Sequence, residues 1–174
     1  MGENINKIAV IGSHGTGKTS LVNMISHKLG YNIIPDIVRE FFNEGYEINE
    51  QTTAETQLQI LERQTKLEKE VPQPWVSDKS IYDNLVYAKV GKQSNELINI
   101  ILDKIALREK YDLIFYLPIE FPLEKDGIRS NDESYQKEID MCFREMIVGG
   151  LINAVSLSGS LEERFKKVIK IIKK

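Results

Sequence analysis

The fold is decided by one stretch of sequence, Gly12-Ser13-His14-Gly15-Thr16-Gly17-Lys18-Thr19. It matches the pattern G-x-x-x-x-G-K-S/T at every fixed position and lies between an expected strand and an expected helix. The glycines let the backbone curve around a phosphate chain and direct its N–H groups inward, at the positive end of a helix. The stretch therefore predicts a phosphate-binding loop (P-loop), in which Lys18 neutralises the outer phosphates and Thr19 offers its hydroxyl to Mg²⁺. We expect all eight residues, and Ser20 after them, to contact the nucleotide.

Outward from this loop, apolar segments alternate with amphipathic ones, which is typical of a parallel sheet covered by helices. Five strands are expected, at residues 7–11, 31–34, 74–77, 113–117 and 151–157. Helices are expected at residues 18–29, 41–42 (a single turn), 53–71, 80–90, 95–110, 132–148 and from 160 onward. Two of the helices begin with the spacing of a capping box, Thr52 with Glu55 and Ser160 with Glu163. The pattern predicts a three-layer α/β fold, but alternation alone does not give the order of the strands.

The composition is that of one soluble domain. The 174 residues are 41% hydrophobic and 28% charged with a net charge of −3, so the whole chain, 1–174, is expected to form a single domain. The acidic balance argues against a protein that coats nucleic acid, although it leaves room for a local basic patch. The longest apolar run, 146–152, is too short to span a membrane, and the lone Cys142 cannot form an internal disulfide. We expect a cytoplasmic protein of undetermined oligomeric state.

Two carboxylates follow the ends of expected strands, where parallel sheets gather their ligand-binding groups. Asp78 is a candidate Mg²⁺ ligand and substrate contact, or alternatively the cap of the next helix. Asp36 is a candidate general base for an attacking hydroxyl, and Arg39 a candidate contact for substrate oxygens. A helix cap for Asp36 and a surface ion pair for Arg39 fit the sequence equally well. The choice of base between Asp36 and Asp78 stays open.

Three further polar residues are candidates for the site. Residues 118–131 form an expected polar lid, and Arg129 near its end is a candidate for stabilising the charge of phosphoryl transfer. Arg144, on the following helix, is a second candidate for the nucleotide. For a lone loop arginine, a solvated surface position is the alternative. Gln64 lies in the apolar stripe of the long helix, so its amide pairs either with a nearby carbonyl or with the edge of a nucleobase or nicotinamide.

Besides the P-loop, three short motifs carry a family resemblance: Asp36-Ile-Val-Arg39-Glu40-Phe41, Val76-Ser77-Asp78 and Asp126-Gly127-Ile128-Arg129-Ser130. The chain resembles the P-loop kinase domain of bacterial ribosylnicotinamide kinases and the wider group of small AAA-like P-loop ATPases and kinases. The resemblance covers nearly the whole chain and implies a P-loop NTPase and nucleoside-kinase-like fold with a short lid. It also implies Mg-ATP as phosphate donor, Asp36 beside the acceptor hydroxyl, Arg129 on the lid, and Ser158 and Gly159 beside the adenine. Asp36 departs from the Glu that this family tends to carry, and residues 77–80 lack the family's second acid.

These features predict an ATP-dependent kinase that transfers the γ-phosphate to a hydroxyl of a nucleoside-like small molecule, such as ribosylnicotinamide, a deoxynucleoside or a nucleotide. One alternative is a nucleotide-dependent switch that hydrolyses ATP or GTP slowly. The guanine-reading string Asn-Lys-x-Asp is absent from the sequence, which weakens the case for GTP without excluding it. Another alternative is a kinase acting on a polynucleotide end or a modified DNA base, for which Lys125, Arg129 and Lys137 provide too few basic residues near the lid.

Lys18→Ala is expected to leave the fold intact and nearly abolish nucleotide turnover. The Lys18 ammonium serves the phosphates, and losing a contact to a developing anion costs about 3 kcal/mol or more, a rate loss of at least ~100-fold. Phosphate transfer and thermal unfolding of the variant measure the two effects separately. Unchanged turnover would contradict the P-loop assignment.

Overall fold

The computed structural model describes residues 5–49, 51–108, 110–122 and 132–173. Its five strands form one parallel sheet in the order β2-β3-β1-β4-β5. The strands are β1 (Lys7–Ile11), β2 (Asn32–Ile34), β3 (Trp75–Asp78), β4 (Leu113–Tyr116) and β5 (Val155–Ser156). The predicted five-stranded α/β architecture is confirmed.

The last strand is much shorter than the predicted 151–157. The backbone N–H groups of Leu151 and Ile152 both donate to the carbonyl of Met146, at distances of 3.0 and 3.2 Å. These two residues therefore wrap the end of the preceding helix, and their N–H groups do not pair with β4. The apolar run that suggested a long strand instead buries Ile152 against the core.

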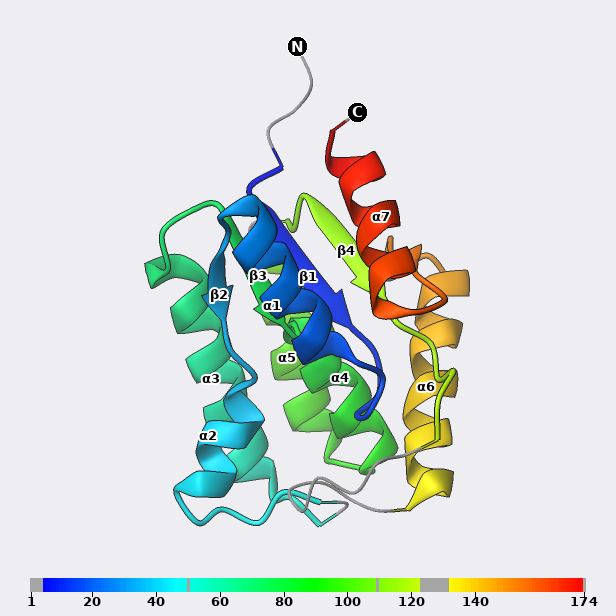
Figure 1. Ribbon diagram of the computed structural model, residues 1–174. Helices are drawn as coiled ribbons and strands as arrows, with labels where there is room; N and C mark the ends of the chain where they lie inside the picture. Colours follow the sequence, from blue (N-terminus) through cyan, green and yellow to red (C-terminus); the bar gives the residue numbers. More distant parts are fainter. Residues whose placement is uncertain (1–4, 50, 109, 123–131, 174) are drawn as a thin grey trace.

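Helices cover both faces of the sheet (Figure 1). One face is covered by α1 (Lys18–Leu29) and α7 (Leu161–Ile172), which lie side by side. The other face carries α3 (Ala54–Glu70), α4 (Ile81–Val90), α5 (Asn95–Leu107) and α6 (Glu133–Val148). The short α2 (Ile37–Asn43) packs on α3 beyond the end of β2. In the described ranges, no helix is both long enough and apolar enough to cross a membrane.

The central strand β1 shows why the sheet is buried on both sides. Side chains of a strand alternate between its two faces. Ile8 and Val10 pack with α1 and α7, whereas Ala9 and Ile11 pack with α3 to α6. All four side chains are fully buried, so a continuous apolar run is what this position requires.

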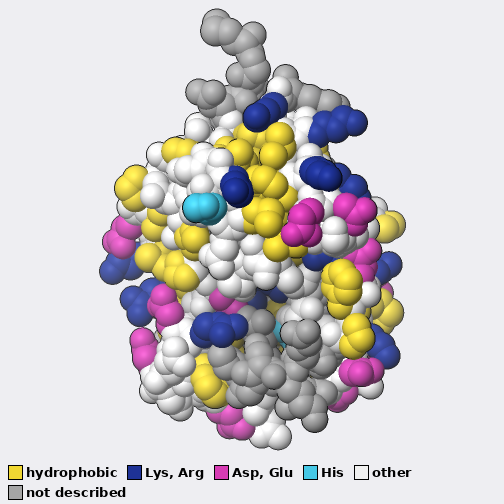
Figure 2. All heavy atoms as spheres, in the orientation of Figure 1, with side chains coloured by type: hydrophobic (Ala, Val, Ile, Leu, Met, Phe, Trp, Pro, Cys, Tyr) yellow, Lys and Arg dark blue, Asp and Glu magenta, His cyan; other side chains and the backbone are white. Residues whose placement is uncertain are grey.

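The α1–α7 layer is amphipathic. Figure 2 shows apolar side chains gathered where the two helices meet, with basic side chains around them. Leu29 of α1 and Phe165 of α7 are partly buried there against the core, whereas Lys166 and Lys170 are exposed. The lysines after Arg164 therefore form the solvated face of a docked helix.

Side-chain caps begin most of the helices, but one of the two predicted capping boxes is wrong. Ser160 and Glu163 form the expected box at the start of α7. At α3 the cap is Thr53, whose hydroxyl accepts from the N–H of Thr56, and not Thr52. The Thr52 hydroxyl is engaged in the preceding turn, where it donates to the carbonyl of Asn49 at 2.7 Å.

The strand order places three chain segments at one edge of the sheet. β1 lies between β3 and β4, so the P-loop that follows β1 lies beside the end of β3. Val10 is paired in register with Asp78. Asp36 follows β2, which lies on the far side of β3 from β1. Asp36 and Asp78, the two predicted acidic groups, therefore both lie at the edge of the sheet that carries the P-loop.

Gly12→Ala is expected to destabilise the fold more than a glycine substitution that carries only backbone strain. Gly12 has φ of 140°, and an added Cβ would lie 2.5 Å from the carbonyl oxygen of Leu117. Gly45 has φ of 94° with open space around it, so Gly45→Ala is the matched control. We expect a loss of about 1 kcal/mol for the control and a clearly larger loss for Gly12→Ala, measured by urea unfolding. Equal losses would show that the backbone yields without cost at Gly12.

Candidate active site

The P-loop is held in shape by its own side chains. Lys18 is buried, and its Nζ donates to the carbonyls of Gly12 and Ser13 at 2.8 and 2.6 Å. The Thr16 hydroxyl also donates to the carbonyl of Ser13, at 2.9 Å. Gly15 and Gly17 adopt left-handed backbone with φ of 73° and 87°, which aims successive N–H groups into one concavity. The loop and the ammonium therefore form a preorganised anion site.

The predicted magnesium ligands lie together. The Thr19 hydroxyl donates to Oδ2 of Asp78 at 2.5 Å. Asp78 is buried, and its Oδ1 has no hydrogen-bond partner among the described residues. Ser80, not Asp78, caps α4, so the helix-cap alternative for Asp78 is wrong. A hydroxyl and an orphaned carboxylate oxygen fit Mg²⁺, which takes oxygen ligands and completes its shell with phosphates and water.

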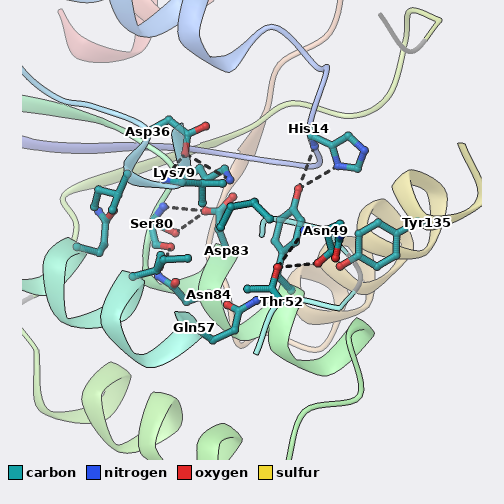
Figure 3. Close-up of a pocket in the computed structure, with 16 residues that line it drawn as sticks. His14, Asp36, Asn49, Thr52, Gln57, Lys79, Ser80, Asp83, Asn84 and Tyr135 are labelled. Carbon is teal, nitrogen blue, oxygen red and sulfur yellow. Dashed lines mark hydrogen bonds and ion pairs between the residues drawn. The ribbon is translucent and has the colours of Figure 1, made fainter. Parts of the chain in front are cut away.

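A pocket opens beside the P-loop, on the α3–α4 side of the sheet (Figure 3). His14 of the P-loop, Asp36, Lys79 and Asp83 contribute to its wall near the phosphate site. Further from the P-loop the wall is made of amide, hydroxyl and apolar side chains, including Ile37, Asn49, Thr52, Gln57, Ile60, Gln64 and Asn84. The pocket thus joins a charged end to a neutral polar end.

Asp36 lies at the site, as the sequence predicted, and it also caps a helix, which was the alternative role. Its Oδ1 accepts from the N–H of Val38 at 3.2 Å and so caps α2. The same oxygen lies 3.4 Å from Nζ of Lys79, and both side chains are almost fully buried. The cap fixes the carboxylate at the pocket wall, so helix capping and a role in the site are compatible.

Lys79 was missed by the sequence analysis. It has left-handed backbone with φ of 84°, and its N–H donates to the carbonyl of Val10 at 3.0 Å. Its Nζ lies 5.0 Å from the centre of the Tyr87 ring, in addition to its ion pair with Asp36. The sequence feature that could have identified Lys79 is its position directly after Asp78, which ends a strand at the ligand-binding edge of the sheet.

Asp83 is a second missed residue. Its Oδ2 accepts from the backbone N–H and the hydroxyl of Ser80, at 2.8 and 3.0 Å, and completes a capping box. Its Oδ1 has no hydrogen-bond partner among the described residues. Burial raises the pKa of this carboxyl to about 6, against the opposing charges of Lys18 and Lys79 and the hydrogen bonds from Ser80.

Gln64 lies in the floor of the pocket with a fixed orientation. Its Nε2 donates to Oε1 of Glu68 at 2.9 Å and to the hydroxyl of Ser77 at 3.0 Å. Since a carboxylate only accepts, the nitrogen must face Glu68. The two donors of the amide are therefore used inside the protein, and its partners are side chains, not the backbone carbonyl considered as the alternative.

Aromatic side chains connect the P-loop to the pocket. The His14 N–H donates to the Tyr87 hydroxyl at 3.2 Å, and its Nδ1 lies at the same distance from this oxygen. The His14 ring also packs 6.2 Å from the ring of Tyr135. Gln136 Nε2 donates to the carbonyl of His14 at 2.7 Å. These contacts set the position of the variable His14 against α4 and α6.

Two of the three predicted arginines, Arg39 and Arg144, do not line this pocket, and the third lies outside the described residues. Arg39 is exposed on α2 and does not line the pocket. Arg144 is over half exposed and pairs with Asp140 on the same helix, Nε to Oδ2 at 2.8 Å, and its contact with the nucleotide stays a prediction. Arg129 and most of the predicted lid, 118–131, lie outside the described residues.

The segment after the last strand is tied to the P-loop by Arg164. This buried arginine donates to the carbonyl of Thr16 at 2.6 Å and to Glu120 at 2.7 Å. Glu120 also accepts from the N–H of Gly159, at 2.9 Å. Burial would raise the pKa of Glu120, but the hydrogen bonds from Arg164 and Gly159, with nearby positive charge, hold it below its usual value. Gly159 is thus connected to the P-loop through Glu120 and Arg164, whereas the position of Ser158 and Gly159 beside the adenine stays a prediction.

A strand-loop-helix phosphate site with an adjacent pocket defines a P-loop protein of the small α/β class. A family model described as an AAA domain matches residues 7–164, and the chain belongs to this family. The family resemblance predicted from the sequence is confirmed.

The relatives include nucleoside kinases. A deoxyguanosine kinase of Bacillus subtilis (strain 168) is 24% identical over 156 residues, which cover 81% of this chain and 74% of that protein. A deoxyadenosine kinase from M. mycoides, solved with dCMP and dCDP, has a TM-score of 0.77 at 20% identity, covering 96% of this chain and 98% of the other. A NadR protein in complex with NR has a TM-score of 0.77 at 22% identity, covering 97% of this chain and 51% of the other. The nucleoside-kinase-like fold is confirmed.

The stability of the protein is expected to fall as pH rises through the titration of Asp83. Its pKa is raised to about 6 in the folded state, so near pH 5 the folded protein binds more protons than the unfolded chain. The Asp83 contribution is therefore fully present below about pH 4 and is lost as pH approaches 7. Asp83→Asn removes this dependence. As pH rises from 4 to 7, the unfolding free energy of wild type should therefore fall relative to that of the variant. A difference constant from pH 4 to pH 7 in urea unfolding would contradict the assignment.

Proposed function

We propose that the protein is a P-loop kinase that transfers the γ-phosphate of ATP to a hydroxyl of a nucleoside-like small molecule. One observation carries the proposal: Asp36, a buried carboxylate, and His14 of the P-loop line the same pocket. A molecule in this pocket would place its hydroxyl between the carboxylate and the phosphate chain. A nucleotide switch needs no such second pocket, and the nucleoside kinases among the relatives support the kinase.

The donor side of the reaction belongs to the P-loop. Its N–H groups and Lys18 would hold the β- and γ-phosphates, since both sit at the start of α1. Thr19 and Asp78 would hold Mg²⁺, which supplies positive charge to the phosphate oxygens when bound.

The acceptor side belongs to Asp36. The acceptor oxygen forms a bond to the γ-phosphorus, the bond from that phosphorus to the β,γ-bridging oxygen breaks, and the hydroxyl proton passes to the Asp36 carboxylate. Lys79 at 3.4 Å balances the carboxylate charge before the proton arrives. Asp78 is hydrogen-bonded to Thr19 at the proposed magnesium position, and Asp83 accepts from Ser80 at the start of α4, so Asp36 is the proposed base.

The neutral end of the pocket would read the base or carboxamide of the acceptor. Gln64 spends both amide hydrogens on Glu68 and Ser77, so it offers its carbonyl oxygen to the ligand. Its preferred partner is therefore a donor such as an amino group or a ring N–H. Asn84 and Gln57 add further amide groups on the same wall.

The direct test incubates the protein with Mg-ATP and a panel of acceptors, and follows the transferred phosphate. The panel contains deoxynucleosides, ribosylnicotinamide, nucleoside monophosphates and DNA ends. Transfer to a nucleoside-like acceptor supports the proposal. Transfer to DNA ends alone, or hydrolysis without any transfer, would overturn it in favour of a polynucleotide kinase or a switch.

Asp36→Asn is expected to lower phosphate transfer by roughly 10²–10⁴-fold with little change in ATP affinity, because Asn keeps the helix cap but cannot accept the proton. Glu44→Gln is the matched control: it removes one negative charge at the exposed end of α2, from a group paired with Arg63 at 3.8 Å. Steady-state transfer, nucleotide binding and thermal unfolding are compared for both variants. An active, stable Asp36→Asn protein would remove Asp36 from the mechanism.

A further inference from the structure

A second cavity lies at the opposite edge of the sheet from the P-loop. Lys7 and Trp75, the first residues of β1 and β3, line it together with part of α3 and the end of α5. The P-loop follows the last residue of β1. The full length of the strand therefore separates this rear cavity from the phosphate site.

The described lining of the rear cavity is strongly basic. It contains one carboxylate and four basic side chains, namely Glu68, Lys7, Lys69, Lys104 and Arg108. The chain as a whole carries a net charge of −3, so this excess of positive charge is local. The nearby carboxylate of Asp112 does not line the cavity. It accepts hydrogen bonds from the backbone N–H groups of Asn6 and Lys7, at 2.7 and 2.9 Å.

Two buried donors in this lining have no acceptor among the described residues. They are the indole Nε1 of Trp75, a side chain 1% exposed, and the Nε of Arg108. Both nitrogens are buried within the wall and closed off from the open space of the cavity, so an anion in the cavity would be held by the four basic side chains. The guanidinium carbon of Arg108 also lies over the Tyr111 ring, 3.5 Å from its centre, which restricts the position of the guanidinium.

We propose that the rear cavity is a binding site for a phosphate-bearing anion, either free phosphate or the phosphate group of a nucleotide. Lys69 and Lys104 come from two different helices and would close on the anion from both sides. Arg108 would add charge-assisted hydrogen bonds, for which its planar fork is suited.

The rear cavity is joined to the front pocket through Glu68. This carboxylate accepts from Arg108 at 2.9 Å in the rear cavity and from Gln64 at 2.9 Å in the floor of the front pocket. It also accepts a hydrogen bond from the Tyr111 hydroxyl, and this hydroxyl in turn accepts one from the backbone N–H of Ile81 at the start of α4. An anion that draws Arg108 away from Glu68 weakens the hold on Gln64, and we infer that it weakens acceptor binding. This coupling rests on the proposed function, whereas the anion site does not.

Trp75 provides the measurement, because it is the single tryptophan of the chain. Its fluorescence is followed while wild type is titrated with inorganic phosphate and, separately, with deoxyadenosine monophosphate. The test variant is Lys69→Ala/Lys104→Ala, which removes two cavity charges and leaves the Glu68–Arg108 pair in place. The control is Lys66→Ala/Lys170→Ala, which removes two exposed lysines outside the cavity, one of them also on α3.

A saturable Trp75 signal is expected in wild type and control, with the dissociation constant raised about tenfold or more in the test variant, since two charge-assisted contacts are lost. Equal affinity in test variant and control would overturn the site, because the P-loop is identical in both. Tighter binding of the monophosphate would identify a nucleotide as the ligand, and equal binding would identify free phosphate. Both results support the shared chemistry.

The coupling is tested with deoxyadenosine, whose binding is measured by calorimetry with and without saturating phosphate. Weaker nucleoside binding with phosphate in the control, and no such change in Lys69→Ala/Lys104→Ala, is the expected result. A deoxyadenosine affinity that is unchanged by phosphate would overturn the coupling but would not affect the proposed anion site. Absence of nucleoside binding under all conditions would speak against the proposed acceptor class, and the fluorescence titration would still decide the rear cavity.

Discussion

The parallel pairing of β1 with β3 is the constraint on which the rest of the site depends. It sets Val10 opposite Asp78, so the strand that delivers the P-loop and the strand that delivers a carboxylate end at the same level. The hydrogen bond from Thr19 to Asp78 then closes the gap between them. The backbone N–H of Lys79 donates to Val10, which extends the ladder by one residue and carries the lysine to the same edge. A slip of one residue in this register would turn Asp78 to the other face of the sheet.

The charged groups at this edge offset the cost of one another's burial. Lys18, Asp36, Lys79 and Asp83 are all almost fully buried, where an isolated charge is strongly unfavourable. Asp36 and Lys79 neutralise each other, and the two lysines partly offset the burial of Asp83. Removing one member changes the electrostatic setting of the others, so single substitutions here are expected to be strongly non-additive.

The features that could be predicted from the sequence are those that depend on residues close together in the chain. The P-loop pattern, the apolar run of β1 and the Ser160–Glu163 spacing each depend on neighbouring residues, and each appears in the structure as expected. Thr52 and Thr53 show the limit, because both fit a cap and only the competing turn at Asn49 decides between them. Arg164 could not be assigned, since its partners Thr16 and Glu120 are brought near by helix docking. Lys79 and Asp83 had local signals, a position after a strand-terminal aspartate and the Ser80–Asp83 spacing, but their place in the pocket depends on the packing of β2, β3 and α4. The role of Arg144 stays a prediction: the structure pairs it with Asp140, one helical turn earlier on α6.

Arg164 has a consequence for the way the protein is made. The carbonyl it binds belongs to Thr16, 148 residues earlier in the chain, and Glu120 receives its other nitrogen. On a ribosome, the start of the phosphate loop emerges long before the helix that braces it. The nascent chain can form β1 and α1 early, but the bracing contact closes a loop of nearly the whole sequence and carries the entropic cost of doing so. The loop that is the most local feature of the sequence therefore reaches its final form only after a helix that begins more than 140 residues later has been made.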